Sequence, residues 1–308
     1  MIRSSLRRLR QLELDPLHAL RVVVRTLIRA LVRLWGRDVM LYTGGVSFFI
    51  MLAIFPALAI LIGLYSLMAD ATQAAREGEA LSRLMPVGAR DIFQNELLRL
   101  SATPHAAMST QSGLALVIGV YAAHRGFKAL LAGLSFIHDE DKPRGFVGFN
   151  VLALVVLVVT FSALGLISAV FFGLRVMGSA FELRPLRGVS WLYSEWTWAS
   201  AGLSLGLACI YRYAMSSRPV DWRASAIGGI TAAALCLGSS WAIAIYVEQV
   251  AHLGATYGSI ATVVVFLIWL SWTVNSIFFG GALATEVEQG LEAMAIHRRP
   301  RVLGDLRV

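Results

Sequence analysis

The sequence predicts an all-α integral membrane protein with six transmembrane helices, both termini in the cytoplasm and an amphipathic interfacial helix before the first span. Three observations lead to this prediction. Hydrophobic residues make up 57% of the 308 residues and charged residues only 15%, whereas soluble domains carry about 25% charge. Six apolar runs are long enough to cross roughly 30 Å of hydrocarbon, which takes about 20 helical residues. The basic residues gather in alternate connections between these runs, as in proteins that follow the positive-inside rule.

The predicted membrane domain covers residues 39–285. Its spans lie at about 40–69, 113–137, 146–174, 191–215, 224–247 and 259–284. The first span contains Pro56, which removes a helix hydrogen bond and predicts a kink. The second is interrupted by the polar stretch HRGFK, so we expect one helix that leaves the bilayer core at His124 and continues into the interface or cytosol. The outer connection, residues 70–112, is soluble in character and predicts short amphipathic helices on the outer face.

The orientation follows from where the basic residues fall. With the N-terminus inside, 20 of the 27 Lys and Arg residues lie on the cytoplasmic side and 7 on the outer side. Because cytoplasmic loops are enriched in Lys and Arg, both termini are predicted to be inside. This leaves residues 1–38 as an Arg-rich cytoplasmic segment and residues 286–308 as a basic cytoplasmic tail. The net charge of +8 therefore indicates topology before it indicates an anionic partner.

The N-terminal segment places an arginine at every fourth position of RVVVRTLIRALVRLWGR. These residues are Arg21, Arg25, Arg29, Arg33 and Arg37. Apolar residues at i, i+3, i+4 spacing occupy the other side of the predicted helix. This pattern, with Trp35 at one end, predicts a helix bound to anionic lipids of the inner leaflet. A helix packed on the protein's own cytoplasmic surface fits the same pattern. A nucleic-acid-binding helix would not need the continuous apolar face, so we expect no specific nucleic acid.

The sequence carries no recognisable catalytic motif. Its six histidines are scattered, and HExxH, GxSxG and P-loop patterns are absent. The acidic stretch HDED, from His138 to Asp141, could hold a divalent cation, but the following Lys142 and Pro143 favour a solvated turn. Cys209 and Cys236 lie inside apolar runs and predict neither a disulfide nor a zinc site. We therefore expect no enzyme activity, no metal and no cofactor.

Four arginines beside the apolar spans are candidates for binding an anionic substrate or lipid head group. They are Arg125, Arg212, Arg218 and Arg223. A guanidinium can hold a phosphate or carboxylate through two parallel hydrogen bonds, and a kinked first span with an interrupted second would supply the broken helices that transporters use. The same arginines satisfy the positive-inside rule without a substrate. A transporter or flippase is therefore one prediction and a non-transporting envelope scaffold or assembly factor is the other, with a homo-oligomer left open.

Four stretches of the chain resemble the YihY/BrkB family of six-span bacterial inner-membrane proteins. They are RDVMLYTGGVSFFIMLAIFPAL (37–58), AHRGFKALLAGLSFI (123–137), RPVDWRASAIGG (218–229) and YGSIATVVVFLIWLSWTVNSIFFGGAL (257–283). Residues matching the family pattern include Asp38, Pro56, Gly126, Trp222, Tyr257, Gly258 and Trp269. The resemblance implies a multi-pass protein of the bacterial cytoplasmic membrane. Some members are linked to virulence as serum-resistance factors, and others have been proposed to move lipids or solutes.

An older description of this family as a ribonuclease looks like a misassignment, and the lack of a metal-site motif here agrees with that. The chain also departs from the family pattern. Phe48 stands where a tyrosine is usual, Ala53 where a serine is usual, and Met215 where a proline often precedes the basic loop. Leu283 replaces a glutamate usual after the last Gly-Ala. If that glutamate couples ions in relatives, this chain lacks it or uses Glu286, one turn nearer the cytosol.

Overall fold

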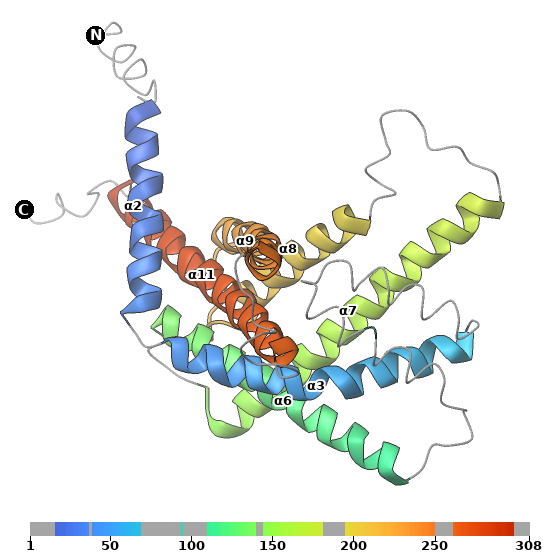
Figure 1. Ribbon diagram of the computed structural model, residues 1–308. Helices are drawn as coiled ribbons and strands as arrows, with labels where there is room; N and C mark the ends of the chain where they lie inside the picture. Colours follow the sequence, from blue (N-terminus) through green and yellow to red (C-terminus); the bar gives the residue numbers. More distant parts are fainter. Residues whose placement is uncertain are drawn as a thin grey trace, which may run out of the picture.

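The computed structural model describes residues 16–36, 39–68, 94, 110–139, 144–180, 195–249 and 261–298, and the regular structure in these ranges is helical. The long helices are α2 (Pro16–Trp35), α3 (Val39–Met68), α6 (Thr110–His138), α7 (Phe146–Ala180), α8 (Glu195–Tyr213), α9 (Trp222–Gln249) and α11 (Ala261–Arg298) (Figure 1). The predicted all-α fold class is thereby confirmed. The predicted outer connection lies outside the described residues, apart from Gln94 and the first turn of α6.

Three helices of the described chain are long and apolar enough to cross a membrane, judged by length and composition. These segments are Phe146–Ile167 in α7, Trp222–Tyr246 in α9 and Val263–Met294 in α11. Leu20–Trp35 and Val39–Ile54 meet the criterion together but are bent by 73° relative to each other, so the number is three, or four if this pair is one span. Each of the six predicted spans coincides with a helix, while membrane crossing by α3, α6 and α8 stays a prediction.

Four helices are longer than the apolar runs from which they were predicted, namely α6, α7, α9 and α11. Helix α6 runs unbroken from Thr110 to His138, so the expected single helix through the HRGFK stretch is confirmed. Helix α11 continues to Arg298, beyond the predicted end of the sixth span at residue 284. Part of the predicted cytoplasmic tail is therefore helical. Helix α2 packs against this part of α11, where Arg33 donates hydrogen bonds to Glu286 and Gln289.

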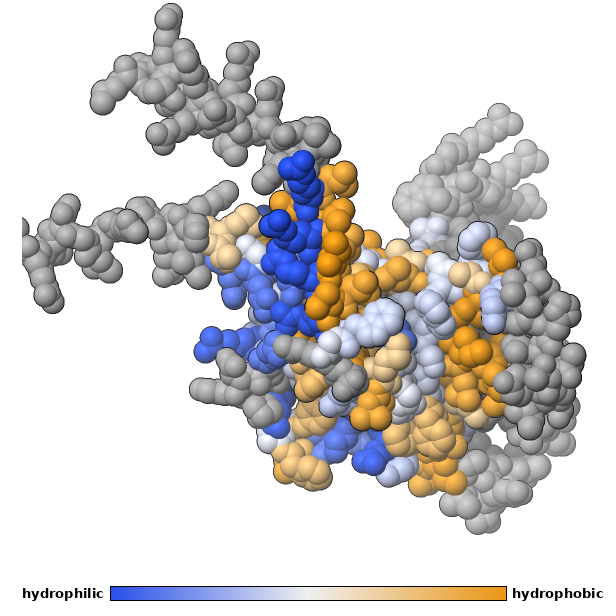
Figure 2. All heavy atoms as spheres, turned by 60° about the vertical axis from the view of Figure 1, so that its left-hand side comes forward, coloured by the Kyte–Doolittle hydropathy of each residue, from blue (hydrophilic) through white to orange (hydrophobic). Residues whose placement is uncertain are grey.

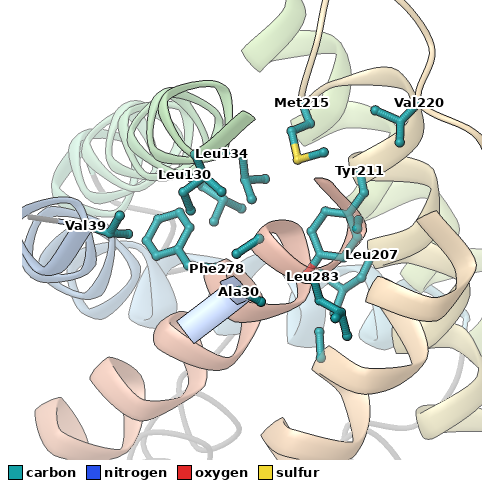
Figure 3. Packing of buried hydrophobic residues seen from close by; sticks show 14 of the residues in the cluster. Ala30, Val39, Leu130, Leu134, Leu207, Tyr211, Met215, Val220, Phe278 and Leu283 are labelled. Atoms are coloured by element: carbon teal, nitrogen blue, oxygen red, sulfur yellow. The ribbon is translucent and has the colours of Figure 1, made fainter. Parts of the chain in front are cut away.

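Helix α11 is the central element of the packing. It contacts α2, α3, α6, α8 and α9, while α3 pairs with α6 and α8 pairs with α9. Figure 1 shows α11 running obliquely through the middle of the molecule, with α2 beside it at one side. Phe278 of α11 packs against Leu130 and Leu134 of α6, and Tyr211 of α8 lies near Met215 (Figure 3). These residues form one continuous apolar core between the two helix pairs.

Glycines allow α9 to approach both of its neighbours closely. A Cβ atom added to Gly228 would lie 2.5 Å from the carbonyl oxygen of Gly280 on α11. A Cβ atom added to Gly229 would lie 2.5 Å from the carbonyl oxygen of Ser204 on α8. Small residues of this kind let the backbones of membrane helices touch. The α8, α9 and α11 backbones are therefore in direct contact at these positions.

The outer surface of the helices is strongly apolar. On α7, the large side chains of Phe146, Val147, Val159 and Leu166 are mostly exposed. Soluble proteins rarely expose contiguous apolar patches of this kind. A row of exposed apolar residues along a long helix is what contact with lipid acyl chains requires, because lipid does not drive such side chains inward as water does.

Candidate functional site

A cluster of polar side chains joins the ends of three helices around Arg33 of α2. Its Nε atom donates a 2.8 Å hydrogen bond to Glu286 Oε1 on α11, and Nη2 lies 2.7 Å from the same oxygen. Nη1 donates to Asp139 Oδ2 at 2.9 Å and to the carbonyl oxygen of Ile137 at 3.1 Å, at the end of α6. Nη2 also donates to Gln289 Oε1 at 3.1 Å. We call Arg33, Asp139, Glu286, Gln289 and the Ile137 carbonyl the Arg33 clasp.

The ion pair at the centre of the Arg33 clasp is largely shielded from solvent. The side chain of Arg33 is 12% exposed and that of Glu286 is 7% exposed. Helix α6 ends at His138, and Asp139 adopts a φ of 58°, a left-handed conformation that aspartate tolerates better than most residues. The last carbonyls of a helix lack intrahelical partners, and a cation near them is favoured by the helix dipole. Arg33 therefore satisfies the end of α6 while pairing with α11.

A second row of contacts extends the cluster to the start of α9. His138 Nδ1 lies 3.1 Å from Thr285 Oγ1, and His138 Nε2 lies 3.8 Å from Glu288 Oε2. Glu288 Oε1 accepts a 3.0 Å hydrogen bond from the backbone N–H of Asp221. Asp221 in turn caps α9, because its Oδ1 accepts the backbone N–H of Arg223 at 2.8 Å. The ends of α2 and α6, the start of α9 and residues 285–289 of α11 thus lie together on one side of the molecule.

The structure corrects the interpretation of HDED as a solvated turn at His138, which is the last residue of α6 and has a side chain that is 18% exposed. Asp139 does lie in a turn, and its side chain is 51% exposed. His138 and Asp139 make the contacts just described, because the end of α6 lies against α2 and α11. Glu140 and Asp141 lie outside the described residues. In the part of the chain that the structure describes, no group of three His, Cys, Asp or Glu residues is arranged to hold a metal ion.

Two of the four candidate anion-binding arginines lie on aromatic rings. The exposed guanidinium of Arg125 lies over the rings of Phe49 and Tyr121, with centroid distances of 5.7 and 5.9 Å. The guanidinium of Arg212 lies over Tyr213 and Trp222, at 5.2 and 5.5 Å. Such stacking is favourable for arginine and leaves the edges of the guanidinium available for hydrogen bonds.

Arg212 uses one of those edges within the protein. Its Nη1 donates a 2.7 Å hydrogen bond to the carbonyl oxygen of Val220, which fixes the connection between α8 and α9. Arg218 and Arg223 lie in this connection and at the start of α9, and both are exposed. Within the described ranges neither of their guanidinium groups has a hydrogen-bond or ion-pair partner. The structure therefore groups Arg212, Arg218 and Arg223 at one connection, whereas Arg125 lies on α6 beside α3.

Arg144 also shapes this connection, and the sequence analysis missed it. Its Nη1 donates to the carbonyl of Ala214 at 3.1 Å, and its Nη2 donates to the carbonyls of Tyr213 at 3.4 Å and of Ser216. These are carbonyls at the end of α8, where intrahelical partners are lacking. In the sequence Arg144 is one more basic residue in a short loop, and no spacing distinguishes it from a topological charge.

The comparisons with known proteins agree with this architecture. Residues 30–301 match the family described as Virulence factor BrkB. The chain belongs to the BrkB family. A UPF0761 membrane protein of Paraburkholderia xenovorans is 32% identical over 109 residues, which is 34% of this chain and 24% of that protein. The chain thus spans about a quarter of the length of the curated relative that it matches. No solved structure matches the chain.

The BrkB resemblance stated from the sequence is confirmed, and with it a multi-pass membrane protein. Several of its motif residues have packing partners in the structure. Trp269 donates from Nε1 to Ser240 Oγ at 2.9 Å and joins α11 to α9. Pro56 lies directly on α6 at Gly119, where an added Cβ would lie 2.1 Å from the proline Cβ.

Two further motif residues of this BrkB protein, Gly126 and Trp222, also have close neighbours. A Cβ atom added to Gly126 would lie 3.4 Å from the Cβ of Phe49. The guanidinium of Arg212 lies over the ring of Trp222. The remaining predicted motif residues Asp38, Tyr257 and Gly258, and the predicted surface residue Arg37, lie outside the described residues.

Proposed function

We propose that this BrkB-family protein crosses the bacterial inner membrane six times and binds an anionic head group at its cytoplasmic face, as a transporter or flippase of a lipid or an anionic solute. The additional spans beyond the apolar stretches of α7, α9 and α11 are α3, α6 and α8. Even α8, the shortest of these, has 19 residues and reaches about 28 Å at 1.5 Å per residue.

Four points of the chain that meet in the polar cluster support six crossings. The polar cluster brings together α2, the end of α6, the start of α9 and the last part of α11. Among the described helices, two separate each of these points from the next along the chain: α3 and α6, then α7 and α8, then α9 and α11. A return to the same side after each pair follows if every helix of the pair crosses the bilayer.

The observation that carries the head-group proposal is the pair of exposed guanidinium groups at Arg218 and Arg223. They lie at a connection that Arg212 and Arg144 hold in place through backbone carbonyls. Ser135 of α6 adds a 3.0 Å hydrogen bond to the carbonyl of Met215. A site held in shape before its ligand arrives loses less entropy on binding, and exposed arginines offer the planar fork that phosphate and carboxylate groups accept.

The second candidate function is a non-transporting envelope scaffold or assembly factor. Direct backbone contact between α9 and α11 at Gly228 and Gly280 favours it, because this contact and the Arg33 clasp hold the helices together. Transport by alternating access requires one group of helices to move against another.

Flux through purified protein in vesicles separates the two functions. We expect proteoliposomes to move a fluorescent anionic phospholipid or anionic solute, and we expect Arg218→Ala and Arg223→Ala to abolish this movement without changing insertion or abundance. Lysine at either position should restore it in part, since an ammonium keeps the charge but loses the planar fork. Arg298→Ala, which removes the same charge from the end of α11, is the matched control.

Lysine variants as active as wild type, or alanine variants with normal flux, would identify these arginines as topological anchors alone. Flux equal to that of protein-free vesicles would exclude transport and favour the scaffold function.

We also propose that the protein has no enzyme activity, ribonuclease included. RNA added to the same vesicles should stay intact, although basic residues can retain RNA at low salt. Cleavage that survives purification and is lost in Asp141→Asn would contradict this.

A further inference from the structure

Helix α2 presents three different faces, and one of them packs against the other helices of the described chain. Ala30 is fully buried, Leu34 packs against the apolar core and Arg33 forms the clasp. Thr26, one turn before Ala30, is partly buried. These positions are three or four residues apart and so form one side of a helix. This side lies against α11.

The other two faces of α2 are exposed. One is apolar and contains Leu20, Val23, Val24, Leu27, Ile28, Leu31 and Trp35, of which Trp35 is 69% exposed. The other contains Arg21, Arg25 and Arg29, which are all exposed. Figure 2 shows the hydrophilic and hydrophobic stripes side by side along this helix. An apolar face that remains open after the helix has packed on its own protein needs another apolar phase.

The direction of α2 suits a helix lying in a membrane surface. The segments Leu20–Trp35 and Val39–Ile54 are bent by 73° relative to each other, with a break of a few residues between them. A helix that lies in the interface next to one that crosses the bilayer makes a large angle of this kind. Trp35, at the end nearest α3, is a residue type that favours the membrane–water boundary.

We propose that the two exposed faces of α2 dock on an anionic phospholipid leaflet, and that Arg33 is the tether that orients this docking instead of a fourth lipid ligand. The apolar face enters the acyl boundary, and Arg21, Arg25 and Arg29 attract phosphate groups. Arg33 lies further along the same stripe, on the side of α2 that faces the protein, and it bonds to Glu286 and to the end of α6. The lipid-bound helix is thereby connected to α11.

This inference is independent of Arg218 and Arg223, so a failure of the flux experiment would leave it standing. It also differs from what the sequence alone predicted, because there Arg33 was expected to contact lipid like the other arginines. Two other occupants of the same surface are a second copy of the chain and RNA. The lipid leaflet is favoured because the charged and apolar stripes run parallel along the exposed helix, and because the next helix, α3, is apolar.

Fluorescent labels on opposite sides of α2 test the docking in the full-length protein. Val24 lies on the apolar face and Val22 on the arginine side, about 200° away at 100° per residue. In a background with Cys209→Ala and Cys236→Ala, a nitrobenzoxadiazole label is placed at Val24→Cys or at Val22→Cys. The protein is reconstituted in vesicles of phosphatidylcholine, with or without phosphatidylglycerol. Quenching is measured with a nitroxide lipid and with aqueous iodide.

We expect phosphatidylglycerol to bring the Val24 label into reach of the lipid quencher while the Val22 label stays open to iodide. Replacing Arg21, Arg25 and Arg29 by glutamine should lower the equilibrium constant for docking about fivefold per arginine at low salt. The matched control, glutamine at Arg298, Arg299 and Arg301, should leave docking unchanged. Arg33→Gln should reduce the difference between the two labels in both kinds of vesicle, because the helix loses its orientation and not its attraction to lipid.

Three results would overturn the proposal. The first is a Val24 label equally open to iodide with and without phosphatidylglycerol. The second is an equal loss of docking in the tail control, which would indicate net charge alone. The third is shielding of both labels together with cross-linking between two chains, or shielding that appears only when RNA is added, which would assign the surface to another occupant.

Discussion

At the residue scale, Arg33 shows how one side chain can replace many weak contacts. A guanidinium has five N–H donors and no acceptor, and Arg33 makes four hydrogen bonds and a further ion-pair contact with groups on α6 and α11. A buried ion pair is favourable only when its remaining donors and acceptors are also satisfied. The Arg33 clasp meets this condition because the end of α6 contributes a carbonyl that lacks an intrahelical partner.

Removing one member of the central ion pair leaves the other charge buried and unpaired. We expect Arg33→Ala or Glu286→Ala to lower the free energy of unfolding by about 3 kcal/mol, measured by thermal or denaturant unfolding in detergent. Arg33→Lys should recover part of the loss, and Arg29→Ala, at an exposed position of the same helix, should change stability by less than about 0.5 kcal/mol. Additive losses in the double variant would show that the two residues act independently.

The sequence allowed the arginine stripe to be predicted but not the separate role of Arg33. Five arginines at the same spacing look equivalent, and the partner Glu286 lies 253 residues further along the chain. The same reason explains why the partners of His138 and Asp139 could not be predicted. Local pattern describes the helix and its faces, whereas the partner of each face depends on tertiary packing.

At the element scale, the contact between α9 and α11 depends on glycines. An added Cβ at Gly228 would meet the carbonyl of Gly280 at 2.5 Å and the Cβ of Ala284 at 2.9 Å. An added Cβ at Gly280 would meet the hydroxyl of Tyr211 at 2.7 Å. That hydroxyl donates a 2.7 Å hydrogen bond to the carbonyl of Ile277. Tyr211 of α8 therefore packs directly at the contact between α9 and α11.

A methyl group at this contact has no free space, because a backbone carbonyl cannot rotate away. We expect Gly228→Ala to lower the free energy of unfolding by about 2 kcal/mol through overpacking. Gly206→Ala is the matched control on α8, since nothing lies within 4 Å of its added Cβ, and it should raise stability by about 0.5 kcal/mol through helix propensity. Unfolding curves of both variants in detergent make the comparison, and equal stability of the two would contradict the close contact.

At the scale of the whole molecule, the apolar runs allowed the long helices of the described ranges to be predicted in their order along the chain. In hydrocarbon every backbone polar group must be paired within the helix, so each apolar run of the required length becomes one helix. The positions of these helices could not be predicted. Packing in lipid depends on small residues and a few polar contacts, and contacts such as Thr43 to Asn275 at 2.9 Å join α3 and α11 across most of the sequence.

The last prediction concerns the topology, that is, the side of the membrane on which each connection lies. The distribution of basic residues predicts that both termini lie inside, and the Arg33 clasp brings α2 to the last part of α11. In a cysteine-free background, we expect single cysteines at Ser101, Ser179 and Gly254 to react with an impermeant maleimide added outside intact cells. Cysteines at Ser217 and Gly290 should react only after the membrane is opened, because the α8–α9 connection bonds to Glu288 on the same side. Labelling of Ser217→Cys from outside would exclude six crossings with both termini in the cytoplasm, since it would place the α8–α9 connection and the end of α11 on the outer face.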